Sequence, residues 1–267
     1  HALRVCMLAP WQLNVCGKSV PSSSWKSKKA LSVFRYLLVH RHSKVHKDTL
    51  LNLFWPNDDP KDAAGSLHTT IYFLRRVIQP ARGAYEGTSF VQYTSGMYWF
   101  EGSESSWIDV DVFHHNYVQG TTYEATNPDR ALDYYKQALA LYKGDFLDEE
   151  AYEDWAEPTR NELRETFIKL SLRTSHLLAR NNENVSEAVG VCRAALAKDP
   201  YREELHQAIM AHLIRAGRYG EAAAQYRQVT ALLLEEFDLP PSPETQSLFF
   251  QMQGVDSSKR STSELAP

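Results

Sequence analysis

AAGSLHTTIYFLRRVIQ (63–79) carries apolar residues at helical spacing, namely Leu67, Ile71, Leu74 and Ile78. Successive residues of an α-helix are rotated by about 100°, so these four side chains share one face. The stretch therefore predicts an amphipathic helix with one buried face. The opposite side is polar and carries no acidic residue; it holds Gly65, Thr69, Tyr72 and Arg76, with Phe73 beside them and Ser66 and His68 on the flanks.

The segments around this helix predict a small mixed fold. Residues 3–9 and 11–15 indicate short strands, because β-branched and aromatic residues are bounded there by Pro10 and Gly17. Helical spacing then predicts a helix from about Ser27, and a shorter one over 47–55 that ends before Pro56. Residues 90–100 indicate a hairpin that turns at Thr94-Ser95-Gly96. This order is typical of a winged helix with an N-terminal sheet, whose third helix faces the DNA major groove.

Beyond Trp107 the sequence predicts long helices. The expected helical ranges are 128–144, 152–180, 185–198, 201–216 and 218–236. Ala188 lies 34 residues before Ala222, and Pro200 follows Ala188 by 12 residues. Paired helices with this period are typical of tetratricopeptide repeats. We therefore expect a mainly α protein: a winged-helix domain over 1–105, an all-α tetratricopeptide-like domain over 106–252, and a flexible polar tail over 253–267.

The charge is distributed unevenly along the chain. Residues 1–105 hold 13 Lys and Arg against 7 Asp and Glu, a net charge of +6 within a total of −4. Residues 106–267 hold 16 against 26, a net charge of −10. A basic first part favours a polyanionic partner for that part alone, although solvated surfaces also show such imbalance.

Composition also argues against export and membrane insertion. The sequence has no long apolar run, and its N-terminus lacks the basic-then-apolar pattern of a secretion signal. Its three cysteines have no metal-like spacing, which agrees with free thiols in a reducing compartment. We expect a cytoplasmic protein with no membrane partner.

Signals for an enzyme, a metal or a cofactor are weak. No Gly-rich segment is followed by the Lys-Ser/Thr pair of a phosphate loop. His40, His42 and His46 suggest a metal site, but no fourth ligand is evident. The acidic run at 148–157 is better explained by an exposed loop or helix start. We expect neither catalysis nor a cofactor.

Basic and hydroxyl side chains near the predicted helix and hairpin are candidates for DNA contact. Lys28 and Lys47 stand at the starts of the first two helices, where they can meet phosphates or simply be solvated. Thr94 and Ser95 lie in the hairpin turn, within reach of a neighbouring groove or the DNA backbone.

Four segments carry a resemblance to a known family: LFWPNDDPKDAAGSLHTTIYFLRRVI (53–78), WIDVDVF (107–113), LYKGDFL (141–147) and the stretch from DPYREE to SPET (199–245). They resemble the Streptomyces antibiotic regulatory protein family. The resemblance implies an OmpR-type winged helix followed by a bacterial transcriptional activation domain. It further implies binding to direct repeats in double-stranded DNA, often with recruitment of RNA polymerase through its sigma factor.

Carried over by position, the recognition-helix residues of that family fall on Ser66, His68, Thr69, Tyr72, Arg75 and Arg76. This sequence differs from the family pattern in three places: His68 stands where arginine is usual, Tyr72-Phe73 replaces a Ser-Arg-like pair, and Trp99 replaces a basic residue of the hairpin.

Two function hypotheses follow. The first is a sequence-specific transcriptional activator, with a homodimer on direct repeats and an effector at the helical domain as further candidate partners. The second is a regulatory module that binds a signal or a protein through its helical domain and binds DNA weakly or not at all.

Overall fold

The computed structural model describes residues 2–8, 10–79, 89–102, 106–150, 153–180, 182 and 184–263, with side chains described as far as 253. The chain divides into two compact units. The first unit comprises His1–His115 and Ala140–Arg164, and the second comprises Asn116–Leu139 and Glu165–Pro267. The first unit therefore takes in segments from both sides of position 105.

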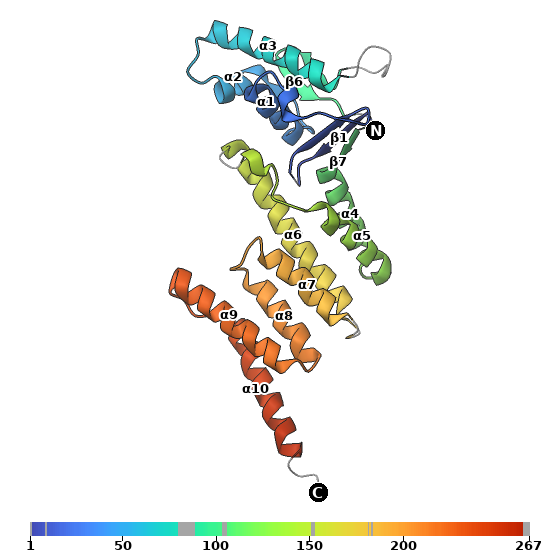
Figure 1. Cartoon of the computed structure of the whole chain (residues 1–267), viewed down its shortest axis with the longest axis vertical. Coiled ribbons are helices and arrows are strands. Elements are labelled where there is room, and N and C mark those ends of the chain that lie inside the picture. Colours follow the sequence, from blue (N-terminus) through green and yellow to red (C-terminus); the bar gives the residue numbers. More distant parts are fainter. Residues whose placement is uncertain are drawn as a thin grey trace. The chain divides into compact units, whose positions relative to one another are not determined.

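A four-stranded sheet forms one part of the first unit (Figure 1). Its strands are β1 (Leu3–Cys6), β2 (Gln12–Val15), β3 (Lys18–Ser19) and β7 (Ser106–Ile108), in the order β3-β2-β1-β7. β1 and β2 are antiparallel, as the short predicted strands suggest, whereas β7 runs parallel to β1 with Leu3 opposite Ser106. The sequence did not predict β7. Three residues are too few to show an alternation of apolar and polar side chains. Only the pairing of this segment with one about 100 residues earlier makes it a strand.

Three helices contribute buried side chains to the core of this unit (Figure 1): α1 (Lys28–Val39), α2 (Lys47–Phe54) and α3 (Pro60–Ile78). Ser27 begins α1 as its N-cap, since its hydroxyl accepts the Ala30 N–H at 3.1 Å. Phe34 of α1 and Leu74 of α3 are fully buried. The helix–helix–helix order expected from the sequence is confirmed.

The predicted hairpin is also confirmed. β5 (Val91–Thr94) and β6 (Met97–Phe100) are antiparallel, and β4 (Val45–His46) completes a second sheet in the order β4-β6-β5. The two turn residues Ser95 and Gly96 have φ values of 48° and 80°. Two left-handed residues in succession match the right-handed twist of the flanking strands, and the glycine adopts this region without strain.

Later segments complete the first unit. The Asp109 carboxylate, at the start of α4 (Asp109–Tyr123), accepts the Met7 and Leu8 N–H groups at 2.7 Å each. Arg35 of α1 donates to Glu150 at 2.7 Å, and both side chains are largely buried. The sheet and α1 therefore depend on residues well beyond the hairpin.

The remaining elements are helical. Three short 3₁₀ helices span Ser22–Ser24, Asp148–Glu150 and Asp154–Ala156. The long helices are α5 (Pro128–Leu141), α6 (Glu157–Leu178), α7 (Val185–Leu196), α8 (Glu203–Arg215), α9 (Tyr219–Phe237) and α10 (Pro243–Ser263). In the second unit α8 packs against α7, α9 and α10, as Figure 1 shows.

The 34-residue period predicted for this part corresponds to the helix pairs α7–α8 and α9–α10. Ala188 and Ala222 take equivalent places and are both fully buried. Small side chains at these positions let neighbouring helices approach, which is the physical basis of the repeat. Helix α10 continues to Ser263, through part of the segment where we expected a tail. The flexibility of that tail stays a prediction.

Candidate nucleic-acid interface

Helix α3 owes its position to a buried stripe and a well-formed start. The Asp59 side chain caps the helix by accepting the Lys61 N–H at 3.0 Å, and Pro60 occupies the first turn. The apolar stripe predicted from the sequence, Leu67, Ile71, Leu74 and Ile78, is buried, and the structure adds Ala63 to it. α3 packs this stripe against α1 and α2. Its opposite side is consequently held in a defined orientation.

The side of α3 opposite the stripe is open to a partner. Gly65, His68, Thr69, Tyr72 and Arg76 are exposed, and Ser66 is half-buried. Tyr72 keeps 56% of its surface accessible, a large value for an aromatic residue. Its ring lies 5.3 Å from that of Phe73, and the Arg76 guanidinium stands 5.8 Å from the Tyr72 centroid. An exposed aromatic next to a cation suits contact with the sugar-phosphate backbone or with base edges.

Arg75 has a different environment from Arg76. It is half-buried, and its guanidinium donates twice to the Val91 carbonyl of β5, at 3.0 and 2.8 Å. This contact ties α3 to the hairpin. Arg75 thus positions the hairpin with these two donors, whereas Arg76 projects from the exposed side.

The hairpin turn and the start of α2 come together. The backbone N–H of Lys47 donates to the Gly96 carbonyl at 2.8 Å. Lys47, Thr94 and Ser95 are all exposed there. Lys28 is exposed as well, in the first turn of α1. His68 of α3 approaches the hairpin from the other side, with its ring 6.4 Å from that of Tyr93.

Three further lysines near the exposed side of α3 and the hairpin lie over aromatic rings. Lys26 is 4.3 Å from the Phe73 centroid, and Lys29 is 4.7 Å from that of Trp55. Lys44 lies 4.4 Å from the ring of Trp99, the residue that replaces a basic one in the family pattern. A cation over an aromatic face is held in place while its charge stays accessible. The two members of each pair are far apart in the sequence, so local spacing does not show that they meet.

A groove of about 710 Å³ lies alongside the exposed face of α3. The N-terminal parts of α1 and α3 form its walls, together with the end of the α2 segment. Its lining residues are Ser27, Lys29, Trp55, Lys61, Asp62, Gly65, Ser66, Thr69 and Thr70. The groove therefore brings two lysines beside two predicted site residues, Ser66 and Thr69.

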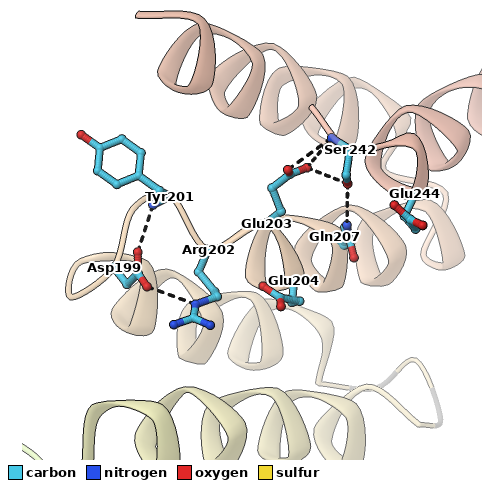
Figure 2. Close-up of a pocket in the computed structure, with 8 residues that line it drawn as sticks. All are labelled: Asp199, Tyr201, Arg202, Glu203, Glu204, Gln207, Ser242 and Glu244. Atoms are coloured by element: carbon cyan, nitrogen blue, oxygen red, sulfur yellow. Dashed lines mark hydrogen bonds and ion pairs between the residues drawn. The ribbon is translucent and has the colours of Figure 1, made fainter. Parts of the chain in front are cut away.

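The second unit has a polar pocket of its own, of about 600 Å³, at the starts of α8 and α10 (Figure 2). The Glu203 carboxylate accepts the Ser242 N–H at 2.9 Å and the Thr245 hydroxyl at 2.6 Å. Arg202 donates to Asp199 at 3.1 Å and is also paired with Glu165. These bonds join α8 to α10 and to α6, so we assign the pocket a structural role.

Other candidate sites find no support. Among the residues that the structure describes, no three His, Cys, Asp or Glu side chains gather as metal ligands, and this includes the region of His40, His42 and His46. Within the same ranges, none of the helices has the length and apolar content needed to cross a bilayer.

A winged helix with an exposed, lysine-flanked third helix, joined to paired helices, is the architecture of a transcription regulator. Residues 108–253 match the family described as "Bacterial transcriptional activator domain". That match covers more than half of the chain, which therefore belongs to this family. The resemblance to the Streptomyces antibiotic regulatory proteins is confirmed.

Relatives extend the likeness over almost the whole chain. "Regulatory protein AfsR" of Streptomyces griseus is 28% identical over 92% of this chain, which spans 24% of that relative. "Transcriptional regulatory protein MoaR1" of Mycobacterium tuberculosis is 25% identical over 94% of the chain and 79% of its own length.

A solved structure shares the fold. It is "Mycobacterium tuberculosis EmbR in complex with low affinity phosphopeptide", with a TM-score of 0.78 and 22% identity. The match covers 95% of this chain and 65% of that one. The likeness confirms the winged helix followed by a helical domain.

Proposed function

We propose that this chain is a sequence-specific, DNA-binding transcriptional activator. Helix α3 enters the major groove with its exposed side, on which Ser66, His68, Thr69, Tyr72 and Arg76 read or contact the DNA. Arg75 supports this role by holding the hairpin through Val91. The observation that carries the proposal is the acid-free exposed centre of α3, which shares a groove with Lys29 of α1 and Lys61 of the first turn of α3.

The lysines supply the part of the affinity that does not depend on sequence. Lys28, Lys29 and Lys47 lie at or near helix N-termini, where backbone N–H groups also favour phosphate. Thr94 and Ser95 of the hairpin turn contact the backbone or the neighbouring groove. In this proposal residues 1–105 bind DNA and residues 106–252 provide activation.

Selection of bound duplexes from a random pool, followed by salt titration, tests DNA binding. Arg76→Ala should weaken binding to the recovered site several-fold and lower the slope of log K against log salt by about 1. Arg193→Ala is a matched control, since it removes the same charge from an exposed position of α7 in the second unit. Its binding curve should equal that of the wild type.

Each outcome of this selection is informative. Equal salt slopes for the wild type and Arg76→Ala would remove Arg76 from the interface. If no duplex is recovered even at low salt, DNA binding is refuted, and the alternative of a protein- or signal-binding module is favoured.

We also propose that two copies bind direct repeats and that the helical unit recruits RNA polymerase through its sigma factor. These steps rest on the family resemblance. A tandem repeat in the recovered duplex, with two shifted species in a gel, supports the first. Transcription with purified holoenzyme from a promoter carrying that repeat tests the second; an unchanged transcript yield on adding the protein would contradict it.

A further inference from the structure

Thr69 lies on the exposed side of α3, and its hydroxyl group already makes a hydrogen bond within the helix. Its Oγ1 donates to the Gly65 carbonyl at 3.0 Å, one turn earlier in the same helix. The hydroxyl proton is therefore used in a hydrogen bond to the helix backbone. Side-chain branches occupy separate staggered positions, so the γ-methyl group stands apart from this bond. What Thr69 offers to a partner is an apolar methyl group rather than a free donor.

Gly65 leaves open space next to that methyl group. It is exposed, and a Cβ added there would meet no heavy atom of a neighbouring described segment within 4 Å. Glycine is among the least favourable residues in a helix interior, and among the described residues no tight packing explains it here. Gly65 and Thr69 both line the groove beside α3.

The same half of α3 lacks the side chain that most often reads guanine. No arginine occurs in α3 before Arg75, and Arg75 donates to the Val91 carbonyl. In the major groove the C5-methyl group of thymine is the one apolar group on a base edge, and threonine methyl groups contact it. An open glycine and an available methyl group one turn apart match that chemistry.

We infer that Gly65 and Thr69 read the C5-methyl group of a thymine, Gly65 by leaving room for the base edge and Thr69 by contacting the methyl group. The inference rests on the proposed function, because it assumes that α3 lies in the major groove. It assigns this part of the helix to an A·T pair and makes Thr69 a specificity-determining residue.

The test replaces each thymine of the selected duplex in turn by uracil, which differs only by the missing C5-methyl group. At one position in each repeat the wild type should lose about four-fold in affinity, equivalent to the ~0.8 kcal/mol of one buried methyl group at 1.4 kcal/mol per tenfold. The remaining thymines should show little change.

Two variants of Thr69 separate its methyl group from its hydroxyl. Thr69→Val keeps a γ-methyl group and should retain the discrimination between thymine and uracil. Thr69→Ser keeps the hydroxyl and loses the methyl group, so its affinities for the two duplexes should become equal. Position 69 is exposed, and equal thermal unfolding of the two variants verifies that folding is unaffected.

Gly65→Ala provides an independent measurement. Its added methyl group meets open space in the free protein and improves helix propensity, so the variant should be at least as stable as the wild type. Its affinity for the selected duplex should nevertheless fall several-fold, since the space reserved for the base edge is filled.

The outcomes distinguish this inference from the function on which it rests. A duplex that binds tightly but shows no loss with uracil at any position, or a Thr69→Ser variant that discriminates as the wild type does, overturns the reading of thymine and leaves DNA binding intact. Failure to recover any duplex overturns both.

Discussion

At the scale of single residues, two side chains of the same type can have different roles because their surroundings differ. Arg75 and Arg76 are adjacent and carry the same charge, yet one donates to the Val91 carbonyl and the other is exposed. Thr69 likewise uses its hydroxyl within the helix. The pKa of His212 also depends on its surroundings. Burial is the main cause that lowers this pKa to about 4, and the nearby charges of His176 and Arg215 lower it further.

His212 therefore links the stability of the second unit to pH. Its Nε2 lies 3.2 Å from the Ser175 hydroxyl, and the residue is 2% exposed. A lowered pKa means that the fold favours the neutral ring. The neutral His212 ring makes its full contribution to the free energy of unfolding above pH 6.5, the approximate pKa of histidine in an unfolded chain. As the pH falls towards 4, roughly 3 kcal/mol of that free energy is lost.

We expect urea unfolding of the wild type to lose this stability between pH 6.5 and 4, whereas His212→Gln loses less. The glutamine side chain can still contact Ser175 but does not titrate in this range. Parallel curves of unfolding free energy against pH for the two proteins would show that His212 is not the linked group.

At the scale of elements, close approach decides which helices pair. In the second unit α4 and α5 meet where Gly120 faces the fully buried ring of Tyr135. The Tyr135 hydroxyl is bonded to Glu124 at 2.5 Å and to Thr121 at 3.4 Å, which fixes the ring in place. The hairpin shows a comparable dependence, since it is attached to α3 through Arg75 and to α2 through Lys47.

Gly120→Ala should destabilise the second unit. The new Cβ would come within 3.0 Å of the Tyr135 ring, and such overpacking costs about 1–3 kcal/mol. Gly190→Ala in α7 is the matched control, because its Cβ would meet no neighbouring described segment within 4 Å. That variant should gain up to about 1 kcal/mol from helix propensity. Thermal unfolding that ranks the two variants in the opposite order would contradict the close contact.

At the scale of the whole chain, a basic first part is joined to an acidic second part. DNA affinity is expected from a protein with an overall charge of −4, because residues 1–105 by themselves carry a net charge of +6. The compact unit that contains these residues nonetheless includes Ala140–Arg164. Backbone bonds to the N-terminal segment come from this later part, including Leu147 N–H to the Met7 carbonyl at 3.0 Å.

A fragment ending at residue 105 should therefore be much less stable than one ending at 164. It would lose the Asp109 carboxylate that binds Met7 and Leu8, and it would leave Arg35 buried without Glu150. Removing one partner of a buried ion pair costs about 3–5 kcal/mol. Thermal unfolding by circular dichroism compares the two fragments. Equal midpoints would mean that the later segment is dispensable for the first unit.

The sequence by itself determined much of the local structure. The period of Leu67, Ile71, Leu74 and Ile78 identified α3, and Ser95-Gly96 identified the hairpin turn. The 34-residue period and helical spacing identified α7, α8 and α9, but not α10. These signals come from neighbouring residues, whose spacing records which side of an element is buried. The family resemblance then connected the elements into a winged helix and an activation domain.

Only the tertiary structure decided the contacts between distant segments. Three contacts leave no trace in local spacing: the parallel pairing of β7 with β1, the hydrogen bonds of Met7 and Leu8 to Asp109, and those of Arg75 to the Val91 carbonyl. Each depends on which groups meet after chain segments far apart in sequence have packed. Periodicity encodes burial within an element, whereas partner choice depends on the three-dimensional arrangement of all of them.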